Sequence, residues 1–305
     1  MLKIKNKILF LIVGILALVV IINTIRNQIR GERTFRSELL KFNPDEVTKI
    51  LLANHEEHLT FEKISNQWMV SDDKNPKSRA DQQAVNNILK DLSLLKIERL
   101  VSREKTKLKE FEVDDTLGTK VSLYKDKKLL GELMIGRFSY RQGGYGGVQL
   151  STMVRLPNEI EVYSVEGALS MSVKLDYRSF RDKTIVELEP SIIQQIEFKY
   201  PGDSSFTITK MNEMWFSGTD TLETGKVVNY LNDIKNLRAG SFVESPSPRE
   251  IPFQVIITPK DLPQITVSAF NDNNRYLFVT SQNDAILSDS EYVFKRLFVS
   301  KKKFK

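Results

Sequence analysis

Several residue types that often carry chemistry are rare or missing in this chain of 305 residues. It has no cysteine, two histidines and two tryptophans. Without cysteine the chain can form no disulfide, thiolate nucleophile, cysteine metal ligand or lipoprotein anchor. The absence of cysteine is compatible with an oxidising compartment but does not require one. With two histidines, a histidine metal site or a Ser-His-Asp arrangement would have to be built around that pair.

An excess of either charge is also missing from most of the chain. Residues 1–41 contain eight Lys or Arg and two Asp or Glu, whereas residues 42–305 contain 37 of each sign. A nucleic-acid-binding protein needs a basic face on its folded part, so we expect no nucleic acid as partner. The densest basic cluster is the C-terminal tail, which we expect to be either a solvated end or a contact for an anionic surface. Its basic residues are Lys301, Lys302, Lys303 and Lys305.

One long apolar run, residues 8–22, follows three lysines near the start of the chain. A bilayer core requires about 20 residues, and residues 8–25 approach this length because the long side chain of Arg26 can reach the headgroups. A cleaved signal peptide would begin in the same way, but no small-x-small cleavage pattern follows. A buried helix of a soluble domain is a third interpretation. We expect an uncleaved signal-anchor helix, with the N-terminus inside and the C-terminal body exported.

The remaining residues show one pattern twice, at a period near 145 residues. Each copy opens with three strands, the third of which carries a tryptophan, and continues with an amphipathic helix, further strands and a short closing helix. The strands are expected at 47–52, 58–63, 66–70, 99–102, 120–124, 129–135, 147–156 and 160–164, and at 193–198, 206–210, 212–216, 241–244, 253–258, 264–270, 276–280 and 285–288. The helices are expected at 80–94 and 166–173, and at 224–237 and 290–298.

Strands crossed by one helix indicate an α+β fold. We expect an N-terminal transmembrane helix followed by two tandem, structurally similar lobes of mostly antiparallel sheet, with a helix packed across each. The domains are expected at 1–41 (signal anchor and basic linker), 42–186 and 187–305. Trp68 and Trp215 are expected on central strands, in the cores. The apolar stripes of the two long helices are Val85, Ile88, Leu89 and Leu92, and Val227, Val228, Leu231 and Ile234.

Three short segments are candidate sites. Residues 55–58 (His-Glu-Glu-His) hold both histidines, but they fall in a predicted hairpin turn, where we expect solvated side chains and no metal site. Acidic pairs such as Asp114-Asp115 also fall at turns, where neighbours rarely face each other across a substrate. The glycine-rich stretch 140–147 is not a phosphate-binding loop, because no Gly-Lys-Ser/Thr and no helix follow it. It is either a long hairpin tip or a docking loop in which Tyr140, Arg141 and Tyr145 contact a partner.

The order of several motifs resembles the domain-of-unknown-function family DUF4340. The resemblance is carried by Trp68, Ala80-Asp81, Val85, Leu89, Leu133, Ile135-Gly136, Val154-Arg155, Val162-Tyr163, Tyr177-Arg178 and Phe180-Arg181-Asp182-Lys183. It implies an anchored envelope protein of Gram-negative bacteria, encoded beside membrane components of an uncharacterised ABC-type transport system, some of them related to gliding-motility proteins. The location implied is the bacterial inner (cytoplasmic) membrane, single-pass, with the body in the periplasm. The resemblance supplies no catalytic residue, metal or cofactor.

Three functions remain open. The first is a non-catalytic accessory or interaction component of an ABC-type transport or envelope assembly system, and it agrees best with an anchor and with the lack of a catalytic motif. The second is an extracytoplasmic binding module for an envelope glycan or lipid. The third is a cell-envelope hydrolase, against which the lack of a nucleophile–base pair counts. We therefore expect a protein that is not an enzyme and that carries no cofactor.

Overall fold

The computed structural model describes residues 16–18, 36, 38–142, 147–243, 253–272 and 275–305. Most of the expected membrane anchor, residues 8–25, lies outside these ranges, and the three described residues within it are helical. No helix within the described ranges is long and apolar enough to cross a bilayer. The anchor and the exported location therefore stay predictions.

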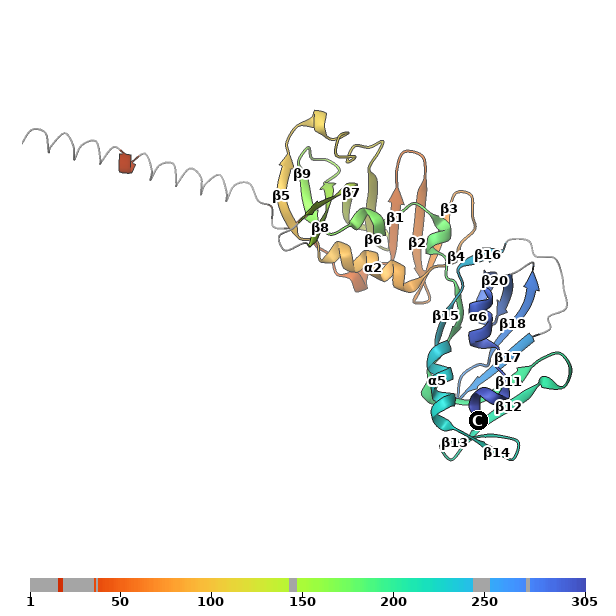
Figure 1. Ribbon diagram of the computed structural model, residues 1–305. Helices are drawn as coiled ribbons and strands as arrows, with labels where there is room; N and C mark the ends of the chain where they lie inside the picture. The colour runs from red at the N-terminus through yellow and green to blue at the C-terminus, as the bar shows by residue number, and fades with distance from the viewer. Residues whose placement is uncertain (1–15, 19–35, 37, 143–146, 244–252, 273–274) are drawn as a thin grey trace, which may run out of the picture. The chain divides into compact units, whose positions relative to one another are not determined.

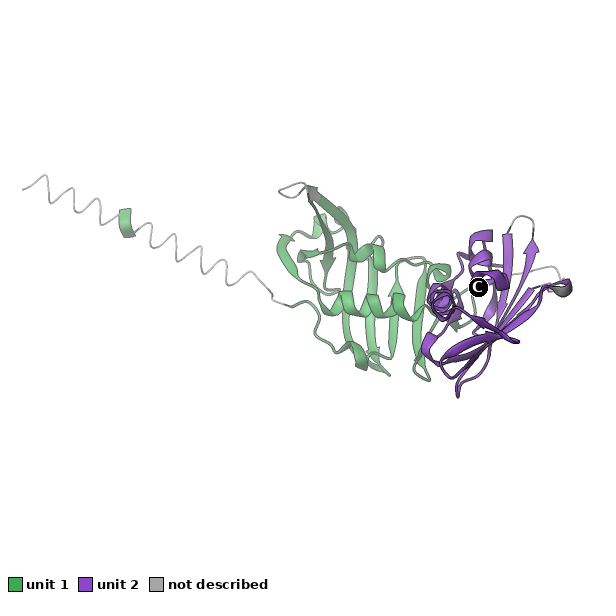
Figure 2. Ribbon diagram, turned by 60° about the horizontal axis from the view of Figure 1, so that its bottom comes forward, with its two compact units in different colours: residues 1–181 green, residues 182–305 purple. Residues whose placement is uncertain are grey.

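The chain divides into two compact units, with the boundary between Arg181 and Asp182 (Figure 2). This boundary lies five residues before the expected one at Glu187. Each unit has its own hydrophobic core. In its described part, each unit also has a nine-stranded, antiparallel sheet, which agrees with the expected α+β class.

In unit 1 the strands lie in the order β4-β3-β2-β1-β6-β7-β8-β9-β5 (Figure 1). The elements of this unit are η1 (Pro44–Glu46), β1 (Lys49–Ala53), β2 (His58–Ile64), β3 (Gln67–Asp72), β4 (Ser78–Arg79), α2 (Gln82–Ser93), β5 (Ile97–Ser102), η2 (Lys105–Lys107), β6 (Thr119–Lys125), β7 (Lys128–Gln142), β8 (Val148–Arg155), β9 (Val162–Glu166), α3 (Leu169–Ser172) and α4 (Tyr177–Phe180).

In unit 2 the order is β14-β13-β12-β11-β17-β18-β19-β20-β16, and β10 pairs with β15 in a separate two-stranded sheet. The elements are β10 (Thr184–Glu187), η4 (Pro190–Ile192), β11 (Ile193–Lys199), η5 (Gly202–Ser204), β12 (Phe206–Met211), β13 (Met214–Ser217), β14 (Asp220–Leu222), α5 (Thr224–Ile234), β15 (Asn236–Arg238), β16 (Ser241–Val243), β17 (Phe253–Pro259), β18 (Ile265–Asp272), β19 (Arg275–Thr280), β20 (Asn283–Asp289), α6 (Glu291–Leu297) and η6 (Lys301–Phe304).

The two nine-stranded sheets have the same connectivity. One strand order becomes the other when each strand of unit 1 is matched to a strand of unit 2. The matches are β1–β4 with β11–β14, β5 with β16, and β6–β9 with β17–β20. The turn between the second and third strands is also alike. Both of its residues have positive φ, at Ser65 and Asn66 in unit 1 and at Asn212 and Glu213 in unit 2. Left-handed residues at both central positions give the twist that a two-residue hairpin needs.

Helix α2 lies across the sheet of unit 1 (Figure 2). Asp81 caps its N-terminus, because the carboxylate accepts hydrogen bonds from the backbone N–H groups of Gln83 and Ala84. The predicted stripe is confirmed, since all four of its residues are buried against the sheet: Val85, Ile88, Leu89 and Leu92.

The predicted stripe of the second helix, α5, is wrong at one position. Val228 is 41% exposed, whereas Tyr230 is fully buried. The tyrosine can occupy the core because its hydroxyl donates a 2.7 Å hydrogen bond to the carbonyl of Leu297. The helix also ends earlier than predicted, because residues 236–238 leave it to pair with β10 as strand β15.

Both tryptophans are buried, at 3% and 2% exposure for Trp68 and Trp215, as expected for core residues. Their expected place on central strands is wrong, because β3 and β13 are each second from an edge of the sheet. Short edge strands that the sequence did not reveal, β4 and β14, cover them on the outer side. In unit 1 the backbone of Trp68 is also bound to helix α2, through both side-chain amide atoms of Gln82.

The end of each unit returns to the start of its long helix. The carbonyl of Phe180 accepts a hydrogen bond from the N–H of Asp81, and the carbonyl of Phe304 accepts one from the N–H of Glu223. Asp81 and Glu223 are the N-cap residues of α2 and α5. Both phenylalanine rings are buried in the core of their own unit. These two closing segments therefore hold the helix layer of each unit in place.

Candidate interaction sites

The hairpin of β7 and β8 exposes several large apolar side chains on one face. Its strands pair Phe138 with Thr152, Tyr140 with Leu150 and Gln142 with Val148. Since paired residues share a face, these side chains lie on the same face as Val154, which belongs to the core under α2. Near the tip this face is exposed, and four apolar side chains meet solvent. We call Phe138, Tyr140, Val148 and Leu150, which are 46%, 75%, 66% and 39% exposed, the hairpin apolar face.

The predicted docking residues are partly placed by this hairpin. Tyr140 lies in the hairpin apolar face, and the backbone of Arg141 pairs with Gln149. Tyr145 lies outside the described residues. That Tyr140, Arg141 and Tyr145 together contact a partner therefore stays a prediction. The sequence analysis did not single out Phe138, Val148 and Leu150. Apolar and polar residues alternate along 138–142 and 148–152, however, and this alternation indicates strands with one apolar face.

The opposite face of the same hairpin is polar. The hydroxyls of Ser139 and Ser151 lie 3.0 Å apart across the strands. The amide of Gln149 donates a 2.9 Å hydrogen bond to the carboxylate of Glu98 on the neighbouring end of β5. Next to these residues is a hollow of about 210 Å³. We call it the polar hollow, and its lining residues are Glu98, Arg99, Gln149 and Ser151.

The remainder of this polar side is covered by the connection between β5 and β6. Leu108 and Val113 of the connection pack against Met153 and Val162 of the sheet. Gly136 is required at this contact, because a Cβ there would lie 2.2 Å from the carbonyl oxygen of Phe111. The polar hollow is therefore open because the connection covers only one end of the strands.

Arg155, one of the residues that carry the family resemblance, fastens this connection. Its side chain is buried, with 4% exposure for the residue. Nε donates to the carbonyl of Val113 at 2.8 Å, Nη1 donates to the carbonyls of Pro157 at 2.6 Å and Glu159 at 3.0 Å, and Nη2 lies 3.1 Å from Asp115 Oδ1. Every one of these acceptors belongs to the protein itself, so the arginine has a structural explanation.

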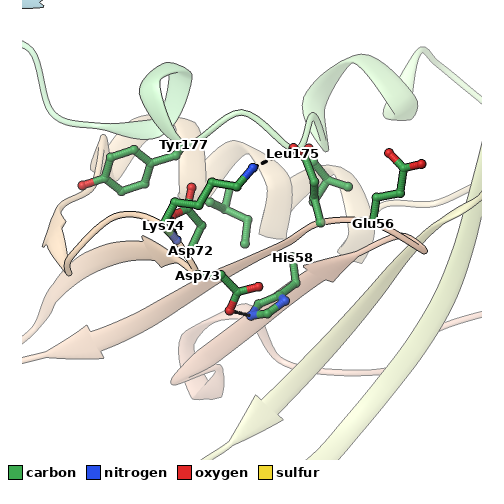
Figure 3. A pocket seen from close by; sticks show the side chains of 9 residues that line it. Glu56, His58, Asp72, Asp73, Lys74, Leu175 and Tyr177 are labelled. Carbon is green, nitrogen blue, oxygen red and sulfur yellow. Dashed lines mark hydrogen bonds and ion pairs between the residues drawn. The ribbon is translucent and has the colours of Figure 1, made fainter.

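Residues 55–57 of the histidine segment lie in the predicted turn between β1 and β2, and His58 is the first residue of β2, where it pairs with Ala53. The carboxamide oxygen of Asn54 accepts from the N–H groups of Glu56 and Glu57, which fixes the turn. Figure 3 shows His58 next to Asp73, with 2.9 Å between Nε2 and Oδ1, at the edge of a small hollow of about 60 Å³. Both side chains are largely exposed. Within the described ranges, no group of three or more His, Asp or Glu residues is arranged to hold a metal ion.

Unit 2 has a wider hollow of about 770 Å³ at the turn between β17 and β18. Its floor includes Ile193 and Ile265, which are buried, and its margin includes Leu262, which is 59% exposed. Glu187, Glu189 and Lys235 add charge to the margin. The volume is within the range of small-molecule sites.

The basic tail forms the short helix η6, which leaves Lys302, Lys303 and Lys305 exposed and buries Phe304. Lys301 and Lys305 each place Nζ 2.9 Å from Asp220 Oδ2, which holds the pKa of that carboxyl below its usual value. Phe304 is fully buried among Phe198, Phe206 and Tyr230. Lys303 also lies 3.9 Å from Asp233 Oδ2, so three of the four tail lysines have a carboxylate of the protein within ion-pair distance, which weakens the case for an anionic surface as their partner.

Comparison with known protein families gives a match over much of the chain. The model of a family described as a domain of unknown function, DUF4340, matches residues 68–255, which is more than half of the chain. No curated protein and no solved structure matches.

Proposed function

This chain belongs to the DUF4340 family, and from that premise we propose that it is a non-catalytic, membrane-anchored envelope protein that binds a protein partner in an ABC-type transport or assembly complex. In this proposal residues 8–25 hold the chain in the bacterial inner membrane, and the two units are tandem repeats in the periplasm. The observation that carries the proposal is the hairpin apolar face, which exposes aromatic and aliphatic side chains on an ordered element.

The size of the face argues for a tethered partner. Complete burial of an apolar side chain of this kind contributes about 1.5–3 kcal/mol. Four side chains that are 39–75% exposed would thus contribute on the order of 3–7 kcal/mol when covered. Association of two free proteins costs about 4–15 kcal/mol. The face alone would therefore give a weak complex in solution, and a shared membrane would raise the local concentration of the partner.

The proposal is tested by site-specific photocrosslinking in native membranes. Tyr140 is replaced by a photoreactive phenylalanine, and Tyr292, a tyrosine of similar exposure on α6, serves as the matched control. We expect a discrete adduct with a membrane protein from position 140 and none of that mass from position 292. If both positions give the same diffuse pattern, or no adduct forms at position 140, the hairpin is not the contact surface and the proposal fails.

A further inference from the structure

The polar hollow is produced by an irregularity in strand β5. Ile97 pairs with Val165, and the next paired residue, Arg99, lies opposite Ser164, so that Glu98 is an extra residue in the ladder. A second irregularity follows between Leu100 and Ser102. A bulge changes the direction in which side chains leave a strand. Here it allows the neighbouring side chains of Glu98 and Arg99 to line the same hollow.

The carboxylate of Glu98 is fixed in position from within the protein. One oxygen accepts the 2.9 Å hydrogen bond from Gln149, and the other accepts a 2.6 Å hydrogen bond from the hydroxyl of Ser164. Ser164 is 1% exposed, so this donor lies beneath the hollow. A carboxylate has about four acceptor positions, and two are used here. The remaining ones are available to a ligand.

Arg99 lacks the nearby carboxylate that the other cations of residues 96–103 have. Lys96 lies 3.8 Å from Glu166 and Arg103 lies 3.9 Å from Glu161. Among the described residues, no carboxylate lies within ion-pair distance of the Arg99 guanidinium, which is exposed at the hollow. The Arg99 side chain also makes no hydrogen bond to another described residue, so its five N–H donors are available for a ligand.

We propose that the polar hollow binds one sugar ring of a glycan. A saccharide hydroxyl donates one hydrogen bond and accepts others, so adjacent hydroxyls can donate to Glu98 and accept from Arg99. For a simple anion or cation, the attraction of one of these two charges is largely cancelled by the repulsion of the other. The hydroxyl of Ser151 and the amide of Gln149 add neutral partners of the same kind.

The dimensions agree with a single ring. The hollow of about 210 Å³ is many times larger than the roughly 10–15 Å³ that one ordered water molecule needs, so it has room for a group larger than a few water molecules. No aromatic side chain of the described residues lines it, so affinity rests on hydrogen bonds that compete with water. We therefore expect weak binding to a monosaccharide, and stronger binding only where a longer glycan adds further contacts. This site is on the opposite face from Tyr140, so its failure would leave the proposed protein contact untouched.

The test is saturation-transfer NMR on the full chain, purified in lauryldimethylamine oxide, a detergent without a sugar headgroup. The probes are N-acetylglucosamine and its β-1,4-linked disaccharide, with inorganic phosphate and ethylammonium as the anionic and cationic comparisons. Arg99→Ala removes the donor and Glu98→Gln removes the charged acceptor. Arg103→Ala is the matched control on the same segment, because Arg103 is exposed and does not line the hollow.

We expect saturation transfer to the saccharides, reduced about tenfold or more in apparent affinity by Arg99→Ala and by Glu98→Gln, since each removes a hydrogen bond to a charged group. Arg103→Ala should leave the affinity unchanged. Equal transfer in all variants, or no transfer to either saccharide, would overturn the proposal. Stronger binding of phosphate or ethylammonium at Arg99 and Glu98 would also overturn it, because the ligand class would then be wrong.

Discussion

The closing segment of unit 2 predicts a large and local loss of stability when Phe304 is replaced by alanine. The ring is fully buried, and its centroid lies 5.4 Å from that of Tyr230 and 6.1 Å from that of Phe198. Phe→Ala in a packed core costs about 3–5 kcal/mol, because the lost burial adds to the cavity that remains. With a urea m-value of about 2 kcal/mol/M, the midpoint of unit 2 should fall by about 1.5–2.5 M.

The two tryptophans make the measurement specific to each unit. In a Trp68→Phe background the tryptophan fluorescence comes only from Trp215 and follows unit 2. In a Trp215→Phe background it comes only from Trp68 and follows unit 1. Phe304→Ala is compared with the unaltered residue in each background by urea unfolding of the full chain in detergent. We expect the shift at Trp215 and little change at Trp68, because the cores of the two units are separate.

Lys302→Ala is the matched control, because its side chain is exposed in the same short helix. Surface changes of this kind usually alter stability by less than about 0.5 kcal/mol. Two outcomes would refute the reasoning. One is a midpoint shift for Phe304→Ala that does not exceed the shift for Lys302→Ala. The other is an equal loss at Trp68 and Trp215, which would mean that the units do not unfold independently.

Two further predictions concern unit 1. Arg155→Met removes hydrogen bonds to the buried carbonyl of Val113 and to the partly buried carbonyls of Pro157 and Glu159, so unit 1 should lose roughly 2–4 kcal/mol in urea unfolding followed at Trp68. A loss below about 1 kcal/mol would mean that the connection is held by its apolar contacts alone. The hydrogen bond from Lys77 is the main cause that holds the pKa of Glu62 below its ordinary value of 4.5, with partial burial opposing it. A depressed folded-state pKa means that the pair stabilises unit 1 above about pH 4.5 and that this contribution is lost as the pH falls through the folded pKa. Lys77→Ala should raise the Glu62 pKa measured by carboxyl-carbon NMR, whereas Lys74→Ala, whose ammonium lies nearer Glu57, should not.

The elements that the sequence predicts correctly are those with a strong period. Alternation places Ile50 and Leu52 inward on β1, and both are fully buried. The spacing of the four apolar residues on α2 likewise predicts which face of the helix is buried. Local pattern was sufficient for these elements because most of the sheet is built from hairpins of neighbouring strands.

The features that the sequence did not reveal depend on partners far along the chain. Strand β5 pairs with β9 across about sixty residues, and nothing local signals that the pairing would place Glu98 as an extra residue. The sequence predicts strand β15 as the end of a helix, because its partner β10 lies about fifty residues earlier and leaves no local signal. The polar hollow combines residues from β5 and β8, so it could be recognised only once the register of the sheet was known.

The boundary after Arg181 bears on how the protein should be divided for laboratory work. A fragment cut at the limits of the family match, residues 68 and 255, would begin inside β3 and stop inside β17. It would lose β1 and β2 from the middle of one sheet and β18, β19 and β20 from the other. Neither half of such a fragment could complete its core, so insolubility after expression would reflect the cutting points and not the protein. Cutting between Arg181 and Asp182 instead leaves Phe180 and Phe304 each with the helix that it secures.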